Sequence, residues 1–256
     1  MTTTVGVVGL GYWGPNLARN FAALPGAELR WLCDGRTELR ERVRADFPQA
    51  RTTGKLDDLL SDRALDAVVL ATPVPSHADL AVRVLEAGKH CFVEKPLAQS
   101  VADAERAVAA ADRADRILMV GHLLQYHPGV TRLKQLVDQG QLGDVRYIYG
   151  NRLNLGKLRA DENALWSLGA HDVSVLLHLA GEEPLELSAR GESYMNPGVE
   201  DVVFAFIECR HFLDCVAEGR APLSDGESGL RVVRVLEGLQ DDLDASRRAV
   251  AAVRAA

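Results

Sequence analysis

The stretch that decides the fold is Val5-Gly6-Val7-Val8-Gly9-Leu10-Gly11-Tyr12-Trp13-Gly14, near the start of a chain of 256 residues. The run Val5–Val8 is apolar without polar alternation, which indicates a strand buried on both faces. Three glycines follow at the spacing G-x-G-x-x-G and lead into a helix. Gly9 permits a tight turn, Gly11 lets the backbone approach a pyrophosphate, and Gly14 permits close contact of helix and strand. The stretch predicts a phosphate-binding turn at the start of a Rossmann fold.

An acidic residue in the right place strengthens this prediction. Asp34 ends the second expected strand, twenty residues after Gly14. A carboxylate there accepts hydrogen bonds from the adenosine ribose and repels a 2′-phosphate, which favours NAD. Arg36, two residues later, offers a guanidinium that a 2′-phosphate would bind, so NADP stays possible. The alternative for Arg36 is a solvated loop arginine.

Up to about Gly121, short apolar runs alternate with amphipathic stretches. The expected strands are Val5–Val8, Leu29–Cys33, Ala67–Ala71, Cys91–Val93 and Ile117–Val120. The expected helices are Gly14–Ala23, Thr37–Ala45, His77–Ala87 and Val101–Arg113. Right-handed crossovers between buried parallel strands place helices on both faces of a sheet. Residues 1–122 are therefore predicted to form an α/β Rossmann domain with a doubly wound parallel sheet.

After Gly121 the pattern changes, and residues 123–256 are predicted to form an α+β domain. The expected helices are Gly129–Gln139, Ala170–Ala180, Cys209–Glu218 and Glu227–Val253, the last two closing the chain over 208–256. The expected strands are Val145–Leu155, Leu185–Ser193 and Val202–Ile207. Their period-two alternation is typical of an antiparallel sheet with one open side. An apolar stripe in the final helix predicts a packing face, through Leu230, Val233, Leu236, Leu239 and Leu243.

The amino-acid composition argues against some classes of binding partner. The formal net charge is −7 and the sequence pI about 5.5, which argues against nucleic acid and anionic membranes. The four cysteines show no CxxC or Cys/His metal spacing, so we expect reduced thiols, no metal and a cytoplasmic location. The chain enters a strand pattern at once, which predicts no signal peptide, and no stretch approaches the roughly 20 apolar residues of a membrane span.

The segment after the third expected strand leads from the sheet into a helix. Loops at the carboxyl ends of parallel strands line the cofactor crevice, so Thr72 and Pro73 are expected beside the cofactor. Ser76 is expected to cap the helix. His77, in the first turn, is expected to be a surface or stacking residue rather than a catalyst.

Glu94-Lys95-Pro96 follows the fourth expected strand. Proline cannot continue a central strand, so the chain turns here and leaves Lys95 at the cofactor edge of the sheet. A lysine near a nicotinamide can polarise a sugar hydroxyl or the ketone that it becomes. The alternative is a surface lysine.

Five motifs in this order resemble the glucose–fructose oxidoreductase/inositol dehydrogenase (Gfo/Idh/MocA) family. They are GLGYWG at 9–14, ATPVPSHADLA at 71–81, EKP at 94–96, GH at 121–122 and LWSLGAHDVSVL at 165–176. The likeness covers residues 3 to about 207 and resumes over 208–239. It is greatest to the branch that acts on nucleotide-activated sugars, such as UDP-N-acetylglucosamine 3-dehydrogenases.

The resemblance implies an NAD(P)-dependent oxidoreductase that moves hydride between the nicotinamide and a sugar carbinol. It implies that Lys95 binds and activates the reacting hydroxyl and that the Lys95–Pro96 bond is cis. His171 is implied as the acid/base, since histidine titrates near neutral pH. Asp172 would orient a base or cap the helix. The predicted cofactor contacts are Gly9, Gly11, Tyr12, Trp13, Gly14, Asp34, Arg36, Thr72, Pro73, His77, Glu94 and Lys95.

A polar, basic stretch precedes His171 and is a candidate for holding a substrate pyrophosphate, because arginine suits bidentate phosphate contacts. The alternative is an exposed strand and loop. The predicted substrate contacts are Lys95, Arg152, Arg159, Asn163 and Asp172.

Two departures from the family bear on activity. The family commonly has an aspartate four residues before the histidine, where this chain has Ser167. The family also continues its antiparallel sheet for several more strands, so the sheet here is expected to be reduced, with an exposed edge and one exposed apolar face. This would weaken a homo-oligomer formed through the sheet. The departures keep open an alternative, an NAD-binding sensor or scaffold without catalysis.

Overall fold

The structure is a computed structural model that describes residues 2–143, 145, 147–153, 162–181, 183–184, 186–195, 197–208 and 226–255. The chain divides into two compact units. The first unit runs to Gly121 and takes in the start of helix α8 (Gly226–Ala255) as far as Leu230. The second unit runs from His122 and takes in α8 from Arg231. In the described ranges no helix combines the length and apolar character needed to cross a membrane.

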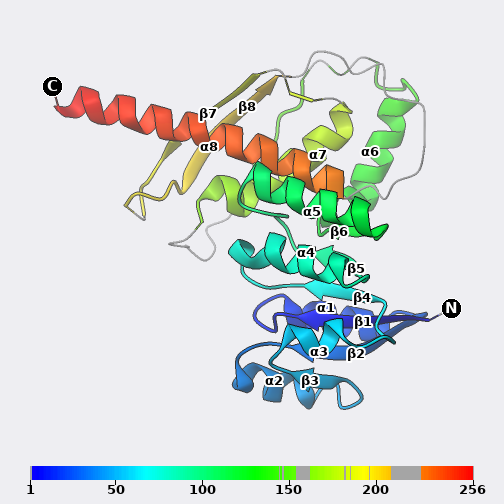
Figure 1. Ribbon diagram of the computed structural model, residues 1–256. Coiled ribbons are helices and arrows are strands. Elements are labelled where there is room, and N and C mark those ends of the chain that lie inside the picture. Colours follow the sequence, from blue (N-terminus) through cyan, green and yellow to red (C-terminus); the bar gives the residue numbers. More distant parts are fainter. Residues whose placement is uncertain are drawn as a thin grey trace. The chain divides into compact units, whose positions relative to one another are not determined.

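The first unit is built on a six-stranded parallel sheet (Figure 1), counted over the described part of the chain. Its strand order is β3-β2-β1-β4-β5-β6, and every neighbouring pair is parallel. The strands are β1 (Thr3–Val8), β2 (Ala27–Cys33), β3 (Arg51–Thr53), β4 (Ala67–Leu70), β5 (His90–Val93) and β6 (Leu118–Val120). The order reverses between β1 and β4, which is the switch point where such sheets bind ligands. The predicted doubly wound sheet is confirmed.

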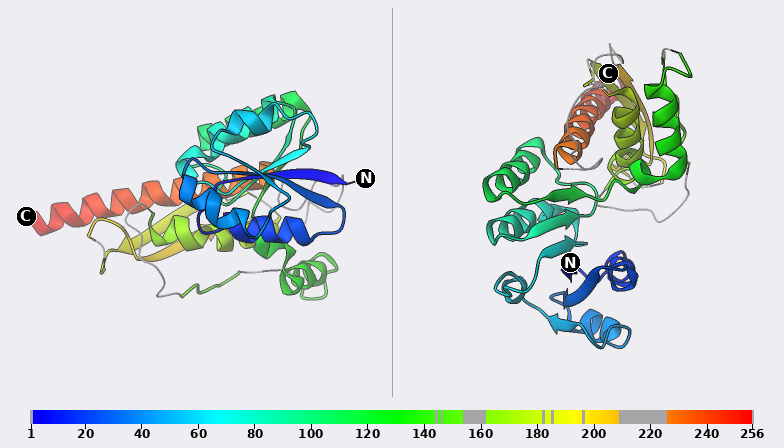
Figure 2. Two further views of the ribbon diagram at one scale, coloured as in Figure 1. Left: turned by 90° about the horizontal axis from the view of Figure 1, so that it is seen from below. Right: turned by 90° about the vertical axis from the view of Figure 1, so that its right-hand side faces the viewer.

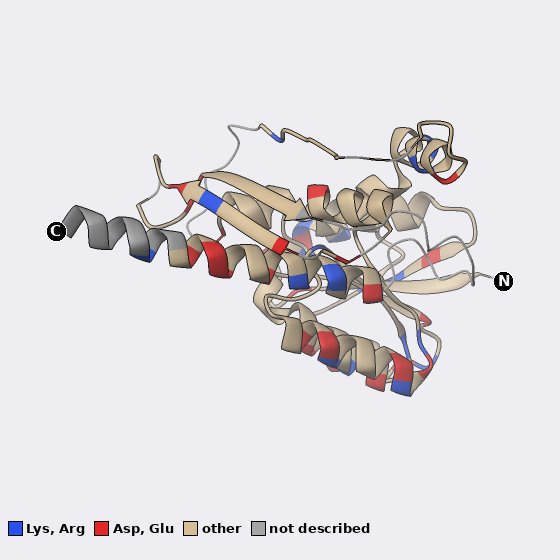
Figure 3. Ribbon diagram, turned by 90° about the horizontal axis from the view of Figure 1, so that it is seen from above, with Lys and Arg blue, Asp and Glu red and all other residues tan. Residues whose placement is uncertain are grey.

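Helices cover both faces of this sheet. They are α1 (Gly14–Ala23), α2 (Thr37–Arg44), α3 (Leu56–Leu60), α4 (His77–Glu86) and α5 (Val101–Ala114), with a 3-10 turn η1 at Val74–Ser76. In the left view of Figure 2, α1 and α2 lie on one side of the sheet and α4 and α5 on the other. On the first side Val5 and Val7 pack with Ala18 of α1 and Val43 of α2. Figure 3 shows acidic and basic residues interleaved along the helices.

β3 and α3 are additions to the predicted elements. They have three and five residues, and segments this short show too few apolar repeats to reveal a period.

The second unit consists of helices with a small sheet. Its described elements are η2 (Leu123–Tyr126), α6 (Pro128–Asp138), a π-helical turn η3 (Leu165–Gly169), α7 (Ala170–Ala180), β7 (Glu186–Glu192), β8 (Val202–Glu208) and most of α8. β7 and β8 pair antiparallel, which confirms the reduced antiparallel sheet. Val173 of α7, Ala189 of β7 and Leu236 of α8 belong to one buried cluster. The predicted apolar stripe of the last helix is buried throughout, so its assignment as a packing face is confirmed.

The expected strand Val145–Leu155 is wrong over its described residues, which adopt no regular structure. Tyr147 and Tyr149 are 85% and 77% exposed. A strand needs the backbone hydrogen bonds of a neighbour, and β7 and β8 pair with each other. The alternation of side chains therefore predicted a strand here. The described part of the chain supplies no neighbouring strand to pair with it. The expected helix 209–218 lies outside the described residues.

The outward face of β8 is apolar and exposed, as predicted for a reduced sheet. Phe204 and Phe206 are 66% and 67% exposed. They stand opposite Arg190 and Ser188 of β7, so polar side chains adjoin them on the same face.

Candidate functional site

The glycine turn after β1 has the shape of a phosphate cradle. Gly9 has φ +90°, and a Cβ on it would lie 2.6 Å from the carbonyl of Ala71 at the end of β4. A Cβ on Gly14 would lie 1.9 Å from the carbonyl oxygen of Gly9. Any side chain at either position would therefore displace the turn. On the outer side of the turn, a Cβ on Gly11 would meet only Arg36 Nη2, at 3.8 Å.

These features fit a dinucleotide. The open space over Gly11 leaves room for a pyrophosphate, and α1 begins at Gly14, so the N–H groups of its first turn face that space with the positive end of the helix dipole. Tyr12 and Trp13 flank the turn, and these residues are 85% and 47% exposed. Their ring centroids lie 5.8 Å apart, edge to face.

Asp34 lies just beyond the end of β2 and is only 8% exposed. Its Oδ2 accepts a hydrogen bond from the Leu10 N–H at 2.8 Å, and its Oδ1 accepts one from the Arg36 N–H at 2.9 Å. Burial alone would raise the pKa of Asp34, but these bonds and the Arg36 guanidinium outweigh it and lower the pKa. The carboxylate is therefore anionic, and it joins the glycine turn at Leu10 to the start of the loop that leads into α2 at Arg36.

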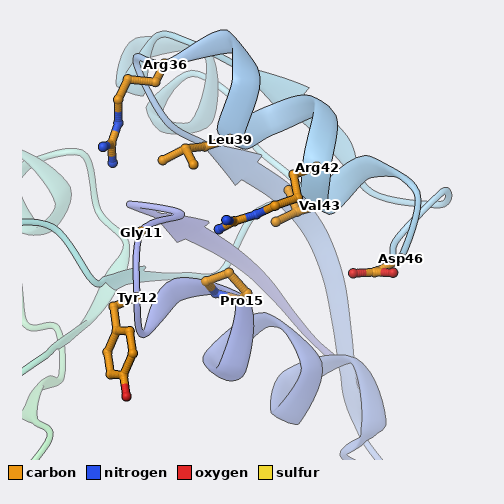
Figure 4. A pocket seen from close by; sticks show the side chains of 8 residues that line it. All are labelled: Gly11, Tyr12, Pro15, Arg36, Leu39, Arg42, Val43 and Asp46. Atoms are coloured by element: carbon orange, nitrogen blue, oxygen red, sulfur yellow. The ribbon is translucent and has the colours of Figure 1, made fainter.

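A pocket of about 520 Å³ opens between the glycine turn and α2 (Figure 4). Arg36 and Arg42 reach into it on either side of Leu39, above Gly11 and Pro15. The full lining is Gly11, Tyr12, Pro15, Arg36, Leu39, Arg42, Val43 and Asp46. Sequence reasoning missed Arg42. Arg42 lies three residues after Leu39 in α2, so the two share one face of that helix, which is the signal that would have found it.

The loop after β4 holds Thr72 and Pro73 beside Gly9. A Cβ on Gly9 would lie 2.8 Å from the Thr72 nitrogen. Ser76 was expected to cap α4, but its Oγ accepts no hydrogen bond from the N–H groups of the helix. The hydroxyl instead lies 2.8 Å from Thr72 Oγ1 and 2.7 Å from the Pro73 carbonyl oxygen. Ser76 therefore fixes the loop, because its short side chain reaches back into the turn.

His77 was expected at the surface, and this is wrong, since it is 1% exposed. Its Nδ1 lies 2.8 Å from the Pro96 carbonyl oxygen and its Nε2 lies 2.8 Å from the Thr72 carbonyl oxygen. Burial lowers the pKa of His77, while the two carbonyls oppose that shift. The ring joins the Thr72 loop to the Lys95–Pro96 segment. This role was predicted neither by a surface position nor by a stacking contact.

Glu94, Lys95 and Pro96 follow β5 at the same edge of the sheet. The Lys95–Pro96 bond is cis, as the resemblance implied. The Lys95 N–H lies 3.3 Å from Glu94 Oε2. Burial raises the pKa of Glu94, which the Lys95 N–H and charge partly offset. A Cβ on Gly121 would lie 3.3 Å from Glu94 Oε2, so the glycine leaves room for that carboxyl.

The second unit carries the other candidate residues. His171 and Asp172 lie in the first turn of α7, directly after the π-helical turn η3. Arg152 binds Asp172 in a bidentate manner, with Nε to Oδ2 at 2.6 Å and Nη2 to Oδ1 at 2.8 Å. This ion pair places a guanidinium next to the helical turn that holds His171. Ser167 lies within η3, three residues before α7 begins.

Asn163 has contacts that give it a structural role. It is 9% exposed, and its Nδ2 donates to Glu200 Oε2 at 3.1 Å and to Gln240 Oε1 at 2.6 Å. Its Oδ1 accepts from the Trp166 N–H at 3.1 Å. Both polar atoms of the Asn163 side chain therefore have partners within the protein. Its contact with the substrate stays a prediction. Arg159 lies outside the described residues.

The structure thus gathers the predicted cofactor residues at one edge of the first sheet. Lys95 belongs to the first unit and His171 to the second. Their action on one substrate stays a prediction.

Comparison with known families gives two matches. Residues 3–122 match the family described as "Oxidoreductase family, NAD-binding Rossmann fold". Residues 130–218 match the "GFO/IDH/MocA C-terminal domain".

Individual relatives agree with these matches. The UDP-N-acetylglucosamine 3-dehydrogenase of Acidithiobacillus ferrooxidans is 31% identical over 73% of this chain and 57% of its own length. The inositol 2-dehydrogenase of Salmonella typhimurium is 29% identical over 72% of this chain and 56% of its own length. The chain thus spans less than three fifths of the length of the curated relatives it matches.

Solved structures share the fold. The WlbA dehydrogenase of Bordetella pertussis, crystallised with NADH and UDP-GlcNAcA, superposes with a TM-score of 0.80 at 22% identity. The match covers 94% of this chain and 96% of that one.

Proposed function

Because this chain belongs to the Gfo/Idh/MocA family of NAD-binding oxidoreductases, we propose that it transfers hydride between a nicotinamide and a sugar carbinol. The observation that carries the proposal is the position of Lys95. It follows β5 at the carboxyl edge of the sheet, and the β1 and β4 turns at the same edge form the cradle around Gly9. His77 ties the Pro96 carbonyl to the Thr72 loop, so the lysine segment is fixed to the cofactor side.

The chemistry follows from the charges. Bound NAD supplies the acceptor for a hydride from the carbinol carbon. Lys95 holds the sugar hydroxyl and favours the negative charge that grows on its oxygen. His171 accepts the hydroxyl proton, so that the carbinol loses a hydride and a proton and becomes a ketone. In the reverse direction His171 returns the proton to the ketone oxygen.

We propose a nucleotide-activated sugar as the substrate. One relative is a UDP-N-acetylglucosamine 3-dehydrogenase and another acts on inositol, so both activated sugars and free polyols belong in the test. The bidentate Arg152–Asp172 pair supports the activated sugar. It keeps a guanidinium beside α7 with a geometry that a pyrophosphate can take over from Asp172.

The test is NAD reduction, followed by nicotinamide absorbance, with UDP- and dTDP-sugars and with free inositol. We expect turnover with a nucleotide sugar. Lys95→Ala and His171→Ala should each lower kcat by about 10²- to 10⁴-fold, and His171→Ala should leave NADH binding nearly unchanged. Lys55→Ala, an exposed lysine of the first unit, is the matched control. Wild-type activity in both Lys95→Ala and His171→Ala would refute the roles of these two residues. Arg152→Ala should raise KM for the nucleotide sugar and leave that for inositol unchanged.

The alternative is a dinucleotide-binding sensor or scaffold. Ser167 favours it, because a hydroxyl stabilises an imidazolium less than the family's carboxylate. Calorimetry would then show tight NAD binding while every sugar leaves the cofactor absorbance unchanged. Ser167→Asp separates the two functions, since a slow enzyme should gain rate and a scaffold should not.

The proposed partner is a small molecule, and the proposed location is the cytoplasm. The buried free thiols of Cys33 and Cys91 support a reducing compartment. A homo-oligomer that is weakened by the shortened sheet stays a prediction.

A further inference from the structure

His77 is a buried titratable side chain that the proposed chemistry does not use. It lies at the start of α4 and is 1% exposed. Its Nε2 lies 2.8 Å from the Thr72 carbonyl oxygen, and its Nδ1 lies 2.8 Å from the Pro96 carbonyl oxygen. The ring therefore lies between the loop after β4 and the segment that carries Lys95. We propose that His77 is a positioning residue, which holds Lys95 in place relative to the loop that receives the cofactor.

Each of these two segments is also anchored on its other side. In the loop after β4, the Ser76 hydroxyl lies 2.8 Å from Thr72 Oγ1. In the other segment, Leu97 is fully buried, and a Cβ on Gly229 would lie 3.4 Å from Leu97 Cβ. Neither segment can shift far without disturbing closely packed atoms. The His77 ring therefore sets the separation of the two.

The ring is itself carried on a packed element. Besides His77, helix α4 has four buried residues, which are Ala78, Ala81, Val84 and Leu85. A side chain on a packed helix holds its partners more precisely than a side chain on an exposed loop. The contact with Pro96 therefore ties the backbone next to Lys95 to the framework of the first unit.

The protons on the ring determine which variants are informative. Backbone carbonyls only accept hydrogen bonds, so each contact needs an N–H on the ring. Burial, and to a smaller extent the charge of Lys95, lowers the pKa of His77, so near neutral pH the ring carries one N–H. One tautomer then binds the Thr72 carbonyl, and the other binds the Pro96 carbonyl. A glutamine at this position offers N–H donors, whereas a leucine offers none.

This inference rests on the role that the proposed function gives to Lys95, so its test includes a measurement that needs no sugar. In wild-type protein with isotopically labelled histidine, the ring nitrogen signals of His77 are identified in NMR spectra by their loss in His77→Gln. We expect these signals to move when NAD is added, because NAD binds beside the Thr72 loop and changes the balance of the two tautomers.

The NMR result and the sugar result can differ. If no sugar is oxidised, the proposed function fails, and the NMR comparison alone decides whether His77 senses the cofactor loop. A response to NAD that is confined to other histidines, or no response from any histidine, would overturn the inference even in an active enzyme.

The kinetic experiment is a double-mutant cycle between His77 and Lys95. With a sugar that the wild type oxidises, His77→Leu should lower kcat at least about tenfold, because a small displacement of a catalytic group costs that much. His77→Gln should lose less. In the Lys95→Ala background both changes should alter the residual kcat by less than about twofold, since the residue that they position is gone. A residue needed only for folding would lower kcat equally in both backgrounds.

His90→Gln is the matched control. His90 begins β5, at the edge of the sheet opposite Lys95, and its Nδ1 accepts a hydrogen bond from the Ile117 N–H at 3.0 Å. The control should keep the kcat of its parent in both backgrounds. Circular dichroism shows which variants fold, and if His77→Leu does not, His77→Gln carries the cycle. Equal losses of kcat with and without Lys95, or no loss in either background, would overturn the proposal.

Discussion

The two sheets of this protein differ in how their side chains are covered. In the first unit β1 buries Val5 and Val7 beneath helices. In the second unit β8 packs only one face, and Phe204 and Phe206 remain exposed. The contrast shows why the two halves differ in how well the sequence predicts them. A run buried on both faces carries its own signal, whereas an alternating strand depends on a partner that only the tertiary fold supplies.

The largest expected effect tests the rigidity of the first sheet's edge. Gly14→Ala should destabilise the chain by about 4 kcal/mol or more, because its Cβ would overlap the Gly9 carbonyl oxygen. Gly35→Ala, with nothing within 4 Å of the added Cβ, is the control and should change stability little. Urea denaturation measures both. Equal stability of the two variants would contradict the tight turn.

The second prediction tests the covered side of the smaller sheet. Leu236 is fully buried between α8 and its neighbours in the second core. Leu236→Ala should lower the free energy of unfolding by about 3 kcal/mol. Asp241→Ala, an exposed position on the same helix, should change it by less than about 0.5 kcal/mol. A small effect of Leu236→Ala would mean that this unit lacks a packed core.

The third prediction compares one histidine from each unit. Burial lowers the pKa of both His77 and His178 from the ordinary 6.5. Below about pH 6.5 the unfolded chain therefore binds more protons than the folded one, and stability falls as the pH falls. His77→Gln should flatten this dependence by up to about 1 kcal/mol per pH unit. His178→Gln should do less, because His178 is only half-buried. Measuring the free energy of unfolding of both variants between about pH 5 and about pH 7 checks this prediction. An unchanged slope in His77→Gln would contradict it.

The smallest effect on stability is expected on the open face. Phe206→Ser should change the free energy of unfolding by less than about 0.5 kcal/mol, since the ring is largely exposed. The same change should reduce binding of the dye ANS and concentration-dependent association seen by light scattering. Strong destabilisation would show that the face is covered.

The first unit could be predicted almost entirely, because the run Val5–Val8 and the glycines after it specify both a buried strand and its turn. The candidate site was predicted less completely. Asp34 and Lys95 lie at the expected edge of the sheet, but the burial of His77 depends on contacts with distant segments. Local sequence marks a residue's chemistry but not the backbone carbonyl that it meets.

The second unit shows the limits of periodicity. Tyr147 and Tyr149 are two residues apart, as on one face of a strand, yet they lie in irregular chain. The buried network of Asn163, Glu200 and Gln240 joins residues far apart in the sequence. No spacing rule connects such residues.

The most direct test of the account follows a deuterium label. A nucleotide sugar that is active in the panel would carry deuterium at its carbinol carbon and be incubated with NAD. Mass spectrometry of the reduced nicotinamide should show one deuterium gained per ketone formed, and in Lys95→Ala both products should form at least about 10²-fold more slowly. Ketone formation that leaves the nicotinamide unlabelled would contradict hydride transfer at this site.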